Sequence, residues 1–330
     1  MTQLRVLIVG CGNIAGGFDQ GRPLGDLPYT HAGAYTRDGR YNLVACVEPD
    51  DKRRRDFMNA WNVPAGYRSI EDASDSGSLF DVISICSPTD CHAHDIEIAL
   101  RMKPKIIFCE KPITTSAAKT EQLIAECNRL NIFFAVNYTR RWDKAISKMQ
   151  TDIQNNRWGL LRSAVGFYNK GILNNGSHMM DLLHCLIGPL DIIKVGKPIY
   201  DFFPEDPTVP VWMEGPRGVP VQLICGHAED YALFELQLIF SHGVLSMEQG
   251  GMFWRERRAV DSTIFNGYRV LEEGICRFGE YPGAMTQAVD NIYRAINHGD
   301  TLAFTTESAI AVQYTCEEIK RRACATAEYA

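Results

Sequence analysis

Residues 6–15 read Val6-Leu7-Ile8-Val9-Gly10-Cys11-Gly12-Asn13-Ile14-Ala15, an apolar run that leads directly into a Gly-x-Gly-x-x-Ala sequence. The run is typical of a buried strand, and the glycines of a turn that opens a helix. Gly10 then permits the tight turn, Gly12 lets the backbone approach a pyrophosphate, and Ala15 keeps the helix close to the strand. Because free amides at a helix start bind phosphate, the stretch predicts dinucleotide binding, with Asn13 and Ile14 among the contacts. The alternative is a tight turn without a ligand.

The first third of the chain alternates apolar runs with helical patterns. The runs lie at residues 5–9, 43–47, 82–86, 106–109 and 133–136, and the helical patterns at 52–61, 92–102 and 116–130. Strands that alternate with helices form parallel sheets with right-handed crossovers. Continuous apolar runs are typical of strands covered on both faces. The sequence therefore predicts an α/β domain with a doubly wound parallel sheet, which we place at residues 1–117.

The remaining residues, 118–330, predict an α+β domain. Their strand patterns alternate with period two, as in a large, open and mostly antiparallel sheet, at residues 161–167, 219–226, 233–241 and 244–249. Helical patterns return at residues 179–186, 284–297 and 306–327. No linker rich in Pro, Gly or Ser separates the two domains.

Composition excludes several classes of protein. With 330 residues, 45% of them apolar, the chain is long enough for two hydrophobic cores. Its 34 Lys and Arg against 40 Asp and Glu lack the cationic excess that nucleic acid attracts, and no run of eighteen apolar residues predicts a membrane span. The 11 cysteines are scattered without framework spacing, and the first apolar run is too short for a signal peptide. We expect a cytoplasmic protein with reduced thiols.

An acidic residue follows the second predicted strand, in Val47-Glu48-Pro49-Asp50. A carboxylate there accepts hydrogen bonds from ribose hydroxyls and repels a 2′-phosphate, so Glu48 favours NAD as the cofactor. Four consecutive cations at residues 52–55 are the opposing signal. One of them would neutralise a 2′-phosphate, although a solvated helix turn also explains them. NADP therefore stays the alternative cofactor.

The segment between Ala15 and Glu48 is longer than in the usual dinucleotide-binding unit. The surplus, residues 16–29, is rich in turn formers and predicts an inserted loop at the carboxyl edge of the sheet. Such a loop either reaches over the substrate, through Asp19, Arg22 and Tyr29, or is a surface excursion. The sequence leaves both interpretations open.

Two further predicted strand ends carry Cys86-Ser87-Pro88-Thr89-Asp90-Cys91-His92 and Cys109-Glu110-Lys111-Pro112. With the glycine turn, they resemble the glucose-fructose oxidoreductase, inositol dehydrogenase and MocA (Gfo/Idh/MocA) family, and the resemblance continues through residues 137–141 and 171–184. It implies an N-terminal NAD(P)-binding Rossmann domain and a C-terminal domain for substrate binding and oligomerisation, with the nicotinamide in the cleft between them. It also implies hydride transfer to or from a hydroxyl or keto carbon of a sugar, with nucleotide-linked and amino sugars as candidates.

The resemblance assigns roles around the cofactor. Lys111 takes the position of the family's lysine that points at the reacting hydroxyl or carbonyl, where an ammonium group donates or orients the moving proton. Glu110 then orients Lys111 or the nicotinamide ribose. The other cofactor contacts implied in this way are Ser87, Pro88, Thr89 and His92, with a structural role as the alternative for His92.

In the second domain, the family pattern of Asp, His and a further Asp reads Asn174, His178 and Asp181. The resemblance makes His178 the second acid/base or a ligand of a substrate hydroxyl, with Asp181 one helical turn away to orient it. Asn174 departs from the pattern, since an amide has no negative charge with which to stabilise a protonated histidine. Tyr168 and Lys170, just before this region, are then candidates to share the proton transfer.

Arg141, beside Arg140, is expected to bind a phosphate or carboxylate of the substrate or to form an inter-domain salt bridge. The candidate substrate contacts are thus Asn174, Asp181, Tyr168, Lys170 and Arg141. No metal site is expected, because His178 and His184, six positions apart, lie about 120° from one another around a helix.

Two other functions compete with a sugar dehydrogenase. One is a glycoside hydrolase that oxidises its sugar transiently and regenerates NAD, and the other is a regulatory protein that kept the dinucleotide pocket without catalysis. Relatives in the family commonly pair through the exposed face of the second-domain sheet, so the resemblance implies a homodimer or homotetramer.

Overall fold

The computed structural model describes residues 3–23, 25–303 and 306–327, and the chain divides into two compact units. Unit 1 comprises Met1–Trp142 and Pro282–Ile310, and unit 2 comprises Asp143–Tyr281 and Ala311–Ala330. The expected boundary at residue 117 falls on the first residue of α5 (Ala117–Arg129), and the strand after it, β6 (Phe133–Val136), still belongs to the first sheet. Unit 1 therefore extends beyond the expected boundary.

Unit 1 is built on a six-stranded parallel sheet in the order β3-β2-β1-β4-β5-β6. Besides β6, its strands are β1 (Leu4–Val9), β2 (Tyr41–Val47), β3 (Ala65–Tyr67), β4 (Val82–Ile85) and β5 (Ile106–Cys109). The strand order reverses between β1 and β4, and ligands of doubly wound sheets bind at such a switch point. The doubly wound parallel sheet predicted from the sequence is confirmed.

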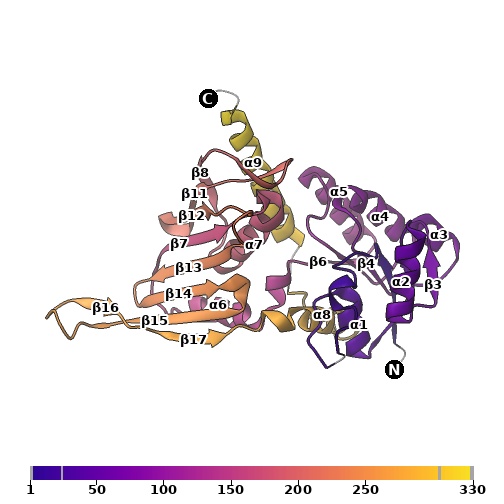
Figure 1. Ribbon diagram of the computed structural model, residues 1–330, viewed down its shortest axis with the longest axis horizontal. Helices are drawn as coiled ribbons and strands as arrows, with labels where there is room; N and C mark the ends of the chain where they lie inside the picture. The colour runs from indigo at the N-terminus through magenta and orange to yellow at the C-terminus, as the bar shows by residue number, and fades with distance from the viewer. Residues whose placement is uncertain (1–2, 24, 304–305, 328–330) are drawn as a thin grey trace. The chain divides into compact units, whose positions relative to one another are not determined.

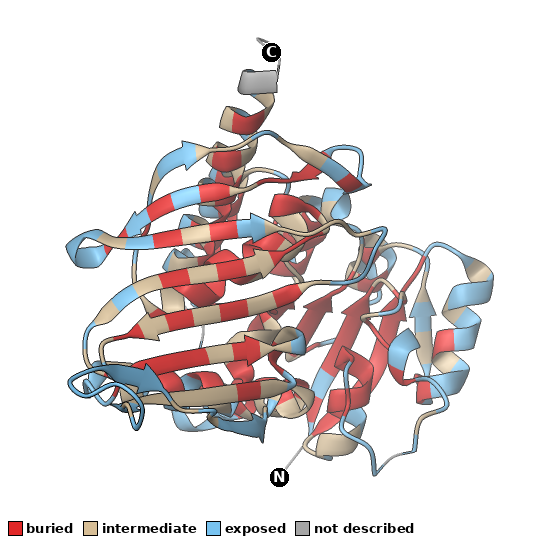
Figure 2. Ribbon diagram, turned by 60° about the vertical axis from the view of Figure 1, so that its left-hand side comes forward, coloured by how far each residue is buried: buried red, intermediate tan, exposed pale blue. Residues whose placement is uncertain are grey.

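Helices cover both faces of this sheet (Figure 1). In addition to α5, they are α1 (His31–Asp38), α2 (Asp51–Trp61), α3 (Ile70–Asp75), α4 (Thr89–Arg101) and α8 (Ala284–His298), with short 3-10 helices η1 (Gly17–Asp19) and η2 (Thr139–Trp142). α3, α4 and α5 pack beside one another, and α1 packs beside α8. Every residue of β4 and β5 is consequently buried (Figure 2).

α8 belongs to unit 1, although its place late in the sequence predicted the second domain. The hydroxyl group of Tyr41 in β2 donates to the carbonyl oxygen of Val289 at 2.5 Å. The guanidinium group of Arg40 pairs with Asp290 at 2.9 Å and lies 4.4 Å from the ring centroid of Tyr293. The prediction was wrong because amphipathic periodicity shows only that a helix needs a partner, not which sheet supplies it.

Unit 2 contains a nine-stranded sheet in the order β16-β15-β14-β13-β7-β12-β11-β8, with β17 paired to β15. Its strands are β7 (Leu161–Tyr168), β8 (Asp191–Val195), β11 (Val211–Gly215), β12 (Val219–Cys225), β13 (Phe234–Phe240), β14 (Gly243–Glu248), β15 (Phe253–Asp261), β16 (Arg269–Leu271) and β17 (Ile275–Phe278). Only β7 and β12 pair in parallel. Burial alternates along β13 (Figure 2), as expected for a sheet covered on one face. The mostly antiparallel sheet is confirmed.

The helices of unit 2 are α6 (Lys144–Gln154), α7 (Ser177–Leu186) and most of α9 (Thr306–Ala327). A π-helical turn, η3 (Gly171–Gly176), leads into α7, and a hairpin of β9 (Ile199–Phe203) and β10 (Asp206–Thr208) packs on it. None of the helices in the described ranges combines the length and the hydropathy needed to cross a membrane.

Candidate functional site

Gly10 begins a tight turn after β1 and lies against the loop that follows β4. Its φ is +86°, and a Cβ atom at this position would come within 2.6 Å of the backbone nitrogen of Ser87. A Cβ atom on Gly12, by contrast, would meet no atom within 4 Å. Gly10 is therefore required by the packing of the protein itself, whereas the backbone at Gly12 leaves room for a bound group.

A single helical turn follows the glycines before the inserted segment interrupts the helix. The amide of Gly16 donates to the carbonyl oxygen of Gly12 at 3.2 Å. After the insertion, the amide of Ala32 donates to the carbonyl oxygen of Ala15 at 2.8 Å. α1 thus begins at His31 and stacks on the first turn. The helix predicted to open at the glycines is therefore not formed there beyond this one turn, and the first α-helix after β1 is α1.

Asp19 closes the inserted segment from inside. Its side chain has no exposed surface and accepts hydrogen bonds from the amides of Tyr29 and Thr30, both at 2.9 Å, and from the hydroxyl of Thr30 at 2.7 Å. The Thr30 hydroxyl in turn accepts from the amide of Gly33 and caps α1. The guanidinium of Arg22 lies 4.3 Å from the ring centroid of Tyr29. The expected substrate contact through Asp19 is therefore wrong, because its carboxylate is used within the segment.

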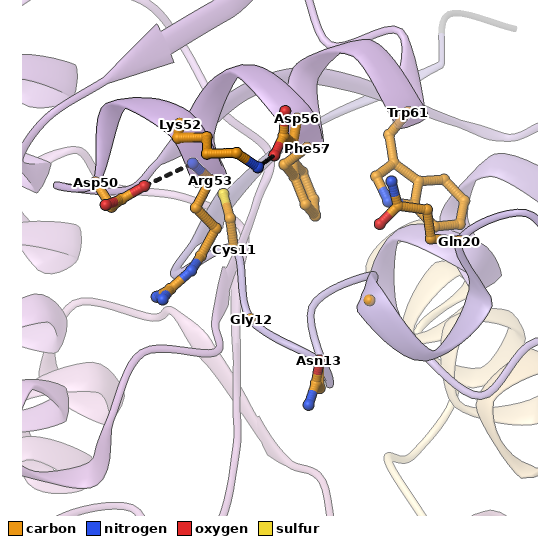
Figure 3. Close-up of a pocket in the computed structure, with 11 residues that line it drawn as sticks. Cys11, Gly12, Asn13, Gln20, Asp50, Lys52, Arg53, Asp56, Phe57 and Trp61 are labelled. Carbon is orange, nitrogen blue, oxygen red and sulfur yellow. Dashed lines mark hydrogen bonds and ion pairs between the residues drawn. The ribbon is translucent and has the colours of Figure 1, made fainter.

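A pocket of about 360 Å³ opens beside the glycine turn (Figure 3). It is lined by Cys11, Gly12 and Asn13 of the turn, by Gly17 and Gln20 of the inserted segment, and by Asp50, Lys52, Arg53, Asp56, Phe57 and Trp61 at and within α2. Lys52 is paired with Asp56 at 2.7 Å, while Arg53 extends toward the space beside Cys11. Backbone amides, a guanidinium group and aromatic rings suit the phosphates and the bases of a dinucleotide, so these residues fit that ligand.

Glu48 directly follows β2, and its carboxylate contacts the glycine turn. It is 4% exposed, and it accepts hydrogen bonds from the amides of Cys11 and Asp50, each at 3.1 Å. The guanidinium of Arg53 lies 3.7 Å from the same carboxylate. A hydrogen bond with Cys46, together with burial, raises the pKa of the Cys11 thiol, so the thiol stays neutral. Glu48 thus lies beside the glycine turn with its carboxylate held by its own chain, and a contact with the ribose stays a prediction.

His92 joins the two motifs that follow β4 and β5. Its Nε2 lies 2.7 Å from the carbonyl oxygen of Ser87, its Nδ1 lies 2.9 Å from that of Pro112, and the residue is 1% exposed. Pro88 precedes α4, which begins at Thr89. Through these contacts His92 fixes the loop after β4 to the Glu-Lys-Pro loop. This supports a structural role for His92, and it gives a physical reason for the two motifs to occur together.

Glu110 lies at the carboxyl end of β5 within a set of buried polar groups. Its Oε1 lies 2.9 Å from Nε2 of His31 and accepts a hydrogen bond from Nδ2 of Asn137 at 2.7 Å. Burial raises the pKa of Glu110, but hydrogen bonds from His31 and Asn137 and the charge of Lys111 outweigh it, so the pKa is lowered. Sequence analysis assigned His31 no role; the signal that was missed is Thr30, an N-cap residue that marks His31 as the start of a helix.

Arg141 lies in η2, at the end of the first long segment of unit 1. Its Nη2 donates to the hydroxyl of Ser308 at 2.7 Å, and Ser308 also belongs to unit 1. The guanidinium group is thus anchored within this unit, and a role toward the substrate stays a prediction.

Three of the predicted residues of unit 2 lie on one continuous helical stretch. Asn174 is in the π-helical turn η3, and His178 and Asp181 follow in α7. Asn174 and His178 are partly exposed, whereas Asp181 is 1% exposed. Lys170 precedes the stretch with φ +66° and accepts at its carbonyl from Nδ2 of Asn174 at 3.1 Å. Single π-helical turns occur frequently at functional sites. No three His, Cys, Asp or Glu residues form a group that could hold a metal ion in the part of the chain that the structure describes.

The β9–β10 hairpin supplies the polar groups that hold the start of this helical stretch. Asp206 accepts from the amide of Asn174 at 2.9 Å. Thr208 accepts at its hydroxyl from the amide of Gly171 at 2.8 Å and donates to Asp201 at 2.7 Å. Sequence reasoning missed these residues, because the only signal was an acceptor-rich Asp-Pro-Thr sequence far along the chain.

Tyr168 has a packing role in unit 2. It has no exposed surface, and its hydroxyl donates to the carbonyl oxygen of Val209 and accepts from the amide of Val209, both at 2.8 Å. Burial raises its pKa well above the ordinary value for tyrosine. The expectation that Tyr168 shares the proton transfer is therefore corrected, since its hydroxyl group already has partners in the core.

In a comparison with known proteins, residues 4–138 match an oxidoreductase family with an NAD-binding Rossmann fold. Myo-inositol 2-dehydrogenase of Thermotoga maritima is 24% identical over 117 residues, which are 36% of this chain and 34% of that protein. Trans-1,2-dihydrobenzene-1,2-diol dehydrogenase of Mus musculus is 25% identical over 248 residues, 69% of this chain and 71% of that protein. The chain spans only about a third of the length of the Thermotoga relative and of two others, at 34%, 27% and 30%.

Among solved structures, the WlbA dehydrogenase from Bordetella pertussis, in complex with NADH and UDP-GlcNAcA, matches with a TM-score of 0.79. The match covers 98% of this chain and 96% of that one at 14% sequence identity. At this identity the likeness shows a shared fold, and it extends over nearly the whole chain.

Proposed function

Because the chain belongs to the Gfo/Idh/MocA family and residues 4–138 form its NAD-binding Rossmann fold, we propose that the protein is an NAD(P)-dependent oxidoreductase acting on a CH–OH group. The observation that carries the proposal is the pocket of about 360 Å³ beside the Gly10–Gly12 turn, at the edge of the sheet where Glu110 and Lys111 follow β5. The cofactor pocket and the ionisable pair thus lie at the same edge of the sheet, at the carboxyl ends of β1 and β5, with β4 between these two strands.

The substrate that we propose is a sugar or cyclic polyol with a secondary hydroxyl group, nucleotide-linked and amino sugars included. Inositol, a dihydrobenzene diol and a UDP-linked sugar acid, the compounds named for the relatives and the solved neighbour, all share a six-membered ring with adjacent polar substituents. A ring of this kind requires several hydrogen-bonding side chains. Asn174, His178 and Lys170, at the partly exposed start of one helix, are the candidates in unit 2.

Lys111 is the proposed acid/base. When bound, the nicotinamide cofactor supplies the acceptor for the hydride of the alcohol carbon. Lys111 takes the hydroxyl proton in oxidation, and its ammonium group returns the proton in reduction. Glu110, the residue before Lys111, supplies an anion whose charge interacts with this amine, with Arg141 as a candidate contact of the substrate. His178 acts as a second acid/base or binds a neighbouring hydroxyl group.

A cofactor-absorbance screen tests the proposal. Purified protein is mixed with NAD or NADP and with cyclic polyols, hexoses, amino sugars and nucleotide sugars, and reduced cofactor is followed. Lys111→Ala should lower kcat by at least about a hundredfold. Lys105→Ala is the matched control, because Lys105 is a surface residue just before β5, at its opposite end, and pairs with Asp81. Undiminished turnover in Lys111→Ala, or no retention of either cofactor, would contradict the proposal. Product formation without net NADH would indicate a hydrolase instead.

We also propose that the protein forms a homodimer or homotetramer and works in the cytoplasm. The outer face of the unit 2 sheet supports the first point, since Trp212 and Ile224, on neighbouring strands and the same face, are each 42% exposed. Light scattering after gel filtration measures the oligomeric state, and a monomer at micromolar concentration would exclude this assembly. Cell fractionation tests the compartment.

A further inference from the structure

A buried histidine lies directly behind Glu110 in unit 1. His31, the first residue of α1, has no exposed surface, and its ring packs against Phe108 with a centroid distance of 4.5 Å. Its Nε2 lies 2.9 Å from Oε1 of Glu110. The Glu110 side chain is 13% exposed, and a carboxylate with so little contact with water is costly unless donors compensate its charge, so each donor beside Glu110 matters to its ionisation.

On its other side, His31 contacts two buried hydroxyl groups in sequence. Nδ1 lies 3.3 Å from Oγ of Ser84, and Ser84 Oγ lies 2.8 Å from the hydroxyl of Tyr35, both residues being fully buried. Burial raises the pKa of Tyr35, so this hydroxyl keeps its proton. When Tyr35 donates to Ser84 and Ser84 donates to Nδ1, the imidazole carries its proton on Nε2, facing Glu110. The chain of hydrogen bonds from Tyr35 through Ser84 and His31 then ends at the Glu110 carboxylate.

Asn137 supplies the second donor to Glu110. The backbone amide of Asn137 donates to the carbonyl oxygen of Cys109 at 2.8 Å, which fixes Asn137 at the end of β6. Its side-chain Nδ2 donates to Oε1 of Glu110 at 2.7 Å. Both contacts use the same carboxylate oxygen. Neither contact uses Oε2, the oxygen that we assign to Lys111 or to a ribose hydroxyl.

The thiols of Cys86 and Cys109, which interact with the charge of Glu110, are neutral. Burial, followed by the charge of Glu110, raises the pKa of Cys86 and of Cys109 well above the ordinary value, and Tyr35 is protonated as described. The charge of Glu110 therefore depends on His31, Asn137 and Lys111.

We propose that His31 is a positioning residue whose buried imidazole holds the Glu110 carboxylate as an anion in a fixed orientation beside Lys111. The inference rests on the proposed function, because it assumes that Lys111 is the acid/base. It also gives the inserted segment a purpose: Asp19 and Thr30 fix the start of α1, and the first residue of α1 is His31.

Three variants separate this role from simple packing. His31→Leu removes both ring nitrogens, whereas His31→Gln keeps an amide donor that can reach Glu110. His94→Leu is the matched control, because His94 makes a comparable contact with Glu71 through Nε2 but is 59% exposed. Circular dichroism and NADH fluorescence titration establish that each variant is folded and binds cofactor.

Two readouts follow the charge of Glu110. The first is carboxyl NMR of protein labelled with 13C-glutamate, in which Glu110→Gln assigns the resonance. The second is the pH profile of kcat/KM. In His31→Leu, we expect the Glu110 titration and the acid limb of the profile to move up by about one pH unit, with His31→Gln close to wild type and His94→Leu unchanged.

An unchanged Glu110 titration in folded His31→Leu would overturn the inference, and so would a shifted titration with an unmoved pH profile. Should His31→Leu not fold, nitrogen NMR of 15N-histidine in the wild type decides the question. A proton on Nε2 and a response coupled to Glu110 are expected, and an unprotonated Nε2 would refute the inference. Because both NMR readouts need no substrate, failure of the proposed function, seen as absent cofactor turnover, is distinguishable from failure of this inference.

Discussion

Replacing Asp19 by alanine should destabilise unit 1 strongly, because it removes the acceptor that closes the inserted segment. The carboxylate accepts from the amides of Tyr29 and Thr30 and from the Thr30 hydroxyl at 2.7–2.9 Å. Tyr29 is 36% exposed, so water can replace its bond, whereas Thr30 is fully buried. Hydrogen bonds to charged groups contribute about 1.5–3 kcal/mol each. Two lost bonds at the lower end of that range predict a decrease of about 3–4 kcal/mol in the free energy of unfolding.

Urea denaturation followed by circular dichroism measures this change, and hydrogen exchange of residues 16–35 shows where it acts. Asp26→Ala is the control within the same segment, because Asp26 is 47% exposed and pairs with Arg22 at 3.5 Å. A surface pair of this kind contributes less than about 1 kcal/mol. We also expect weaker NADH binding in Asp19→Ala, since Gly17 and Gln20 of the segment line the pocket. The reasoning is refuted if Asp19→Ala is no more destabilising than Asp26→Ala.

The remaining predictions concern the turn, the packing of α8 and pH. Gly10→Ala should destabilise the protein by about 2 kcal/mol or more in thermal unfolding, because φ is +86° and the new Cβ would lie 2.6 Å from a backbone atom. Gly12→Ala, with no atom within 4 Å of its Cβ, should melt like the wild type but bind NADH more weakly in fluorescence titration; unchanged affinity would place the phosphates elsewhere. Tyr41→Phe removes the hydrogen bond to Val289 and should cost about 1 kcal/mol in urea denaturation. Glu110 has a folded pKa below its ordinary value of 4.5, so its anion stabilises the fold fully above pH 4.5 and loses this effect as the pH falls through the lowered value. The stability difference between wild type and Glu110→Gln should therefore change only below pH 4.5, and a change near neutrality would be contrary to this assignment.

Much of the first unit could be predicted because its signals are local. The run at residues 106–109 is β5 itself, and the glycine turn and the Glu-Lys-Pro motif each follow an apolar run. Once the runs are recognised as parallel strands, their carboxyl ends must share one edge of the sheet, which brings the motifs together without further information. For the same reason, the alternating pattern of residues 233–241 was sufficient to predict β13 in a sheet with one covered face.

Residues with polar side chains were predicted less well. The sequence around Tyr168 is compatible with a substrate-facing hydroxyl, yet Val209, 41 residues later, uses that hydroxyl completely. Asp19 likewise lies in a segment whose composition is typical of an exposed turn, but its side chain is buried inside the segment that it closes. A side chain's donors and acceptors do not reveal their partners, and the partner decides whether the group serves the fold or a ligand.

By itself, the sequence determined the two types of sheet, the turn that suits a dinucleotide and the strand end that carries Lys111, because hydrophobic periodicity and turn chemistry act over a few neighbouring residues. Only the tertiary structure decided that His31 meets Glu110, 79 residues away, that α8 packs on the first sheet and that Asp206 holds the helix of Asn174. Such pairings depend on which surfaces meet when the layers pack and on which buried polar groups then lie within hydrogen-bonding distance, and local pattern carries no record of either.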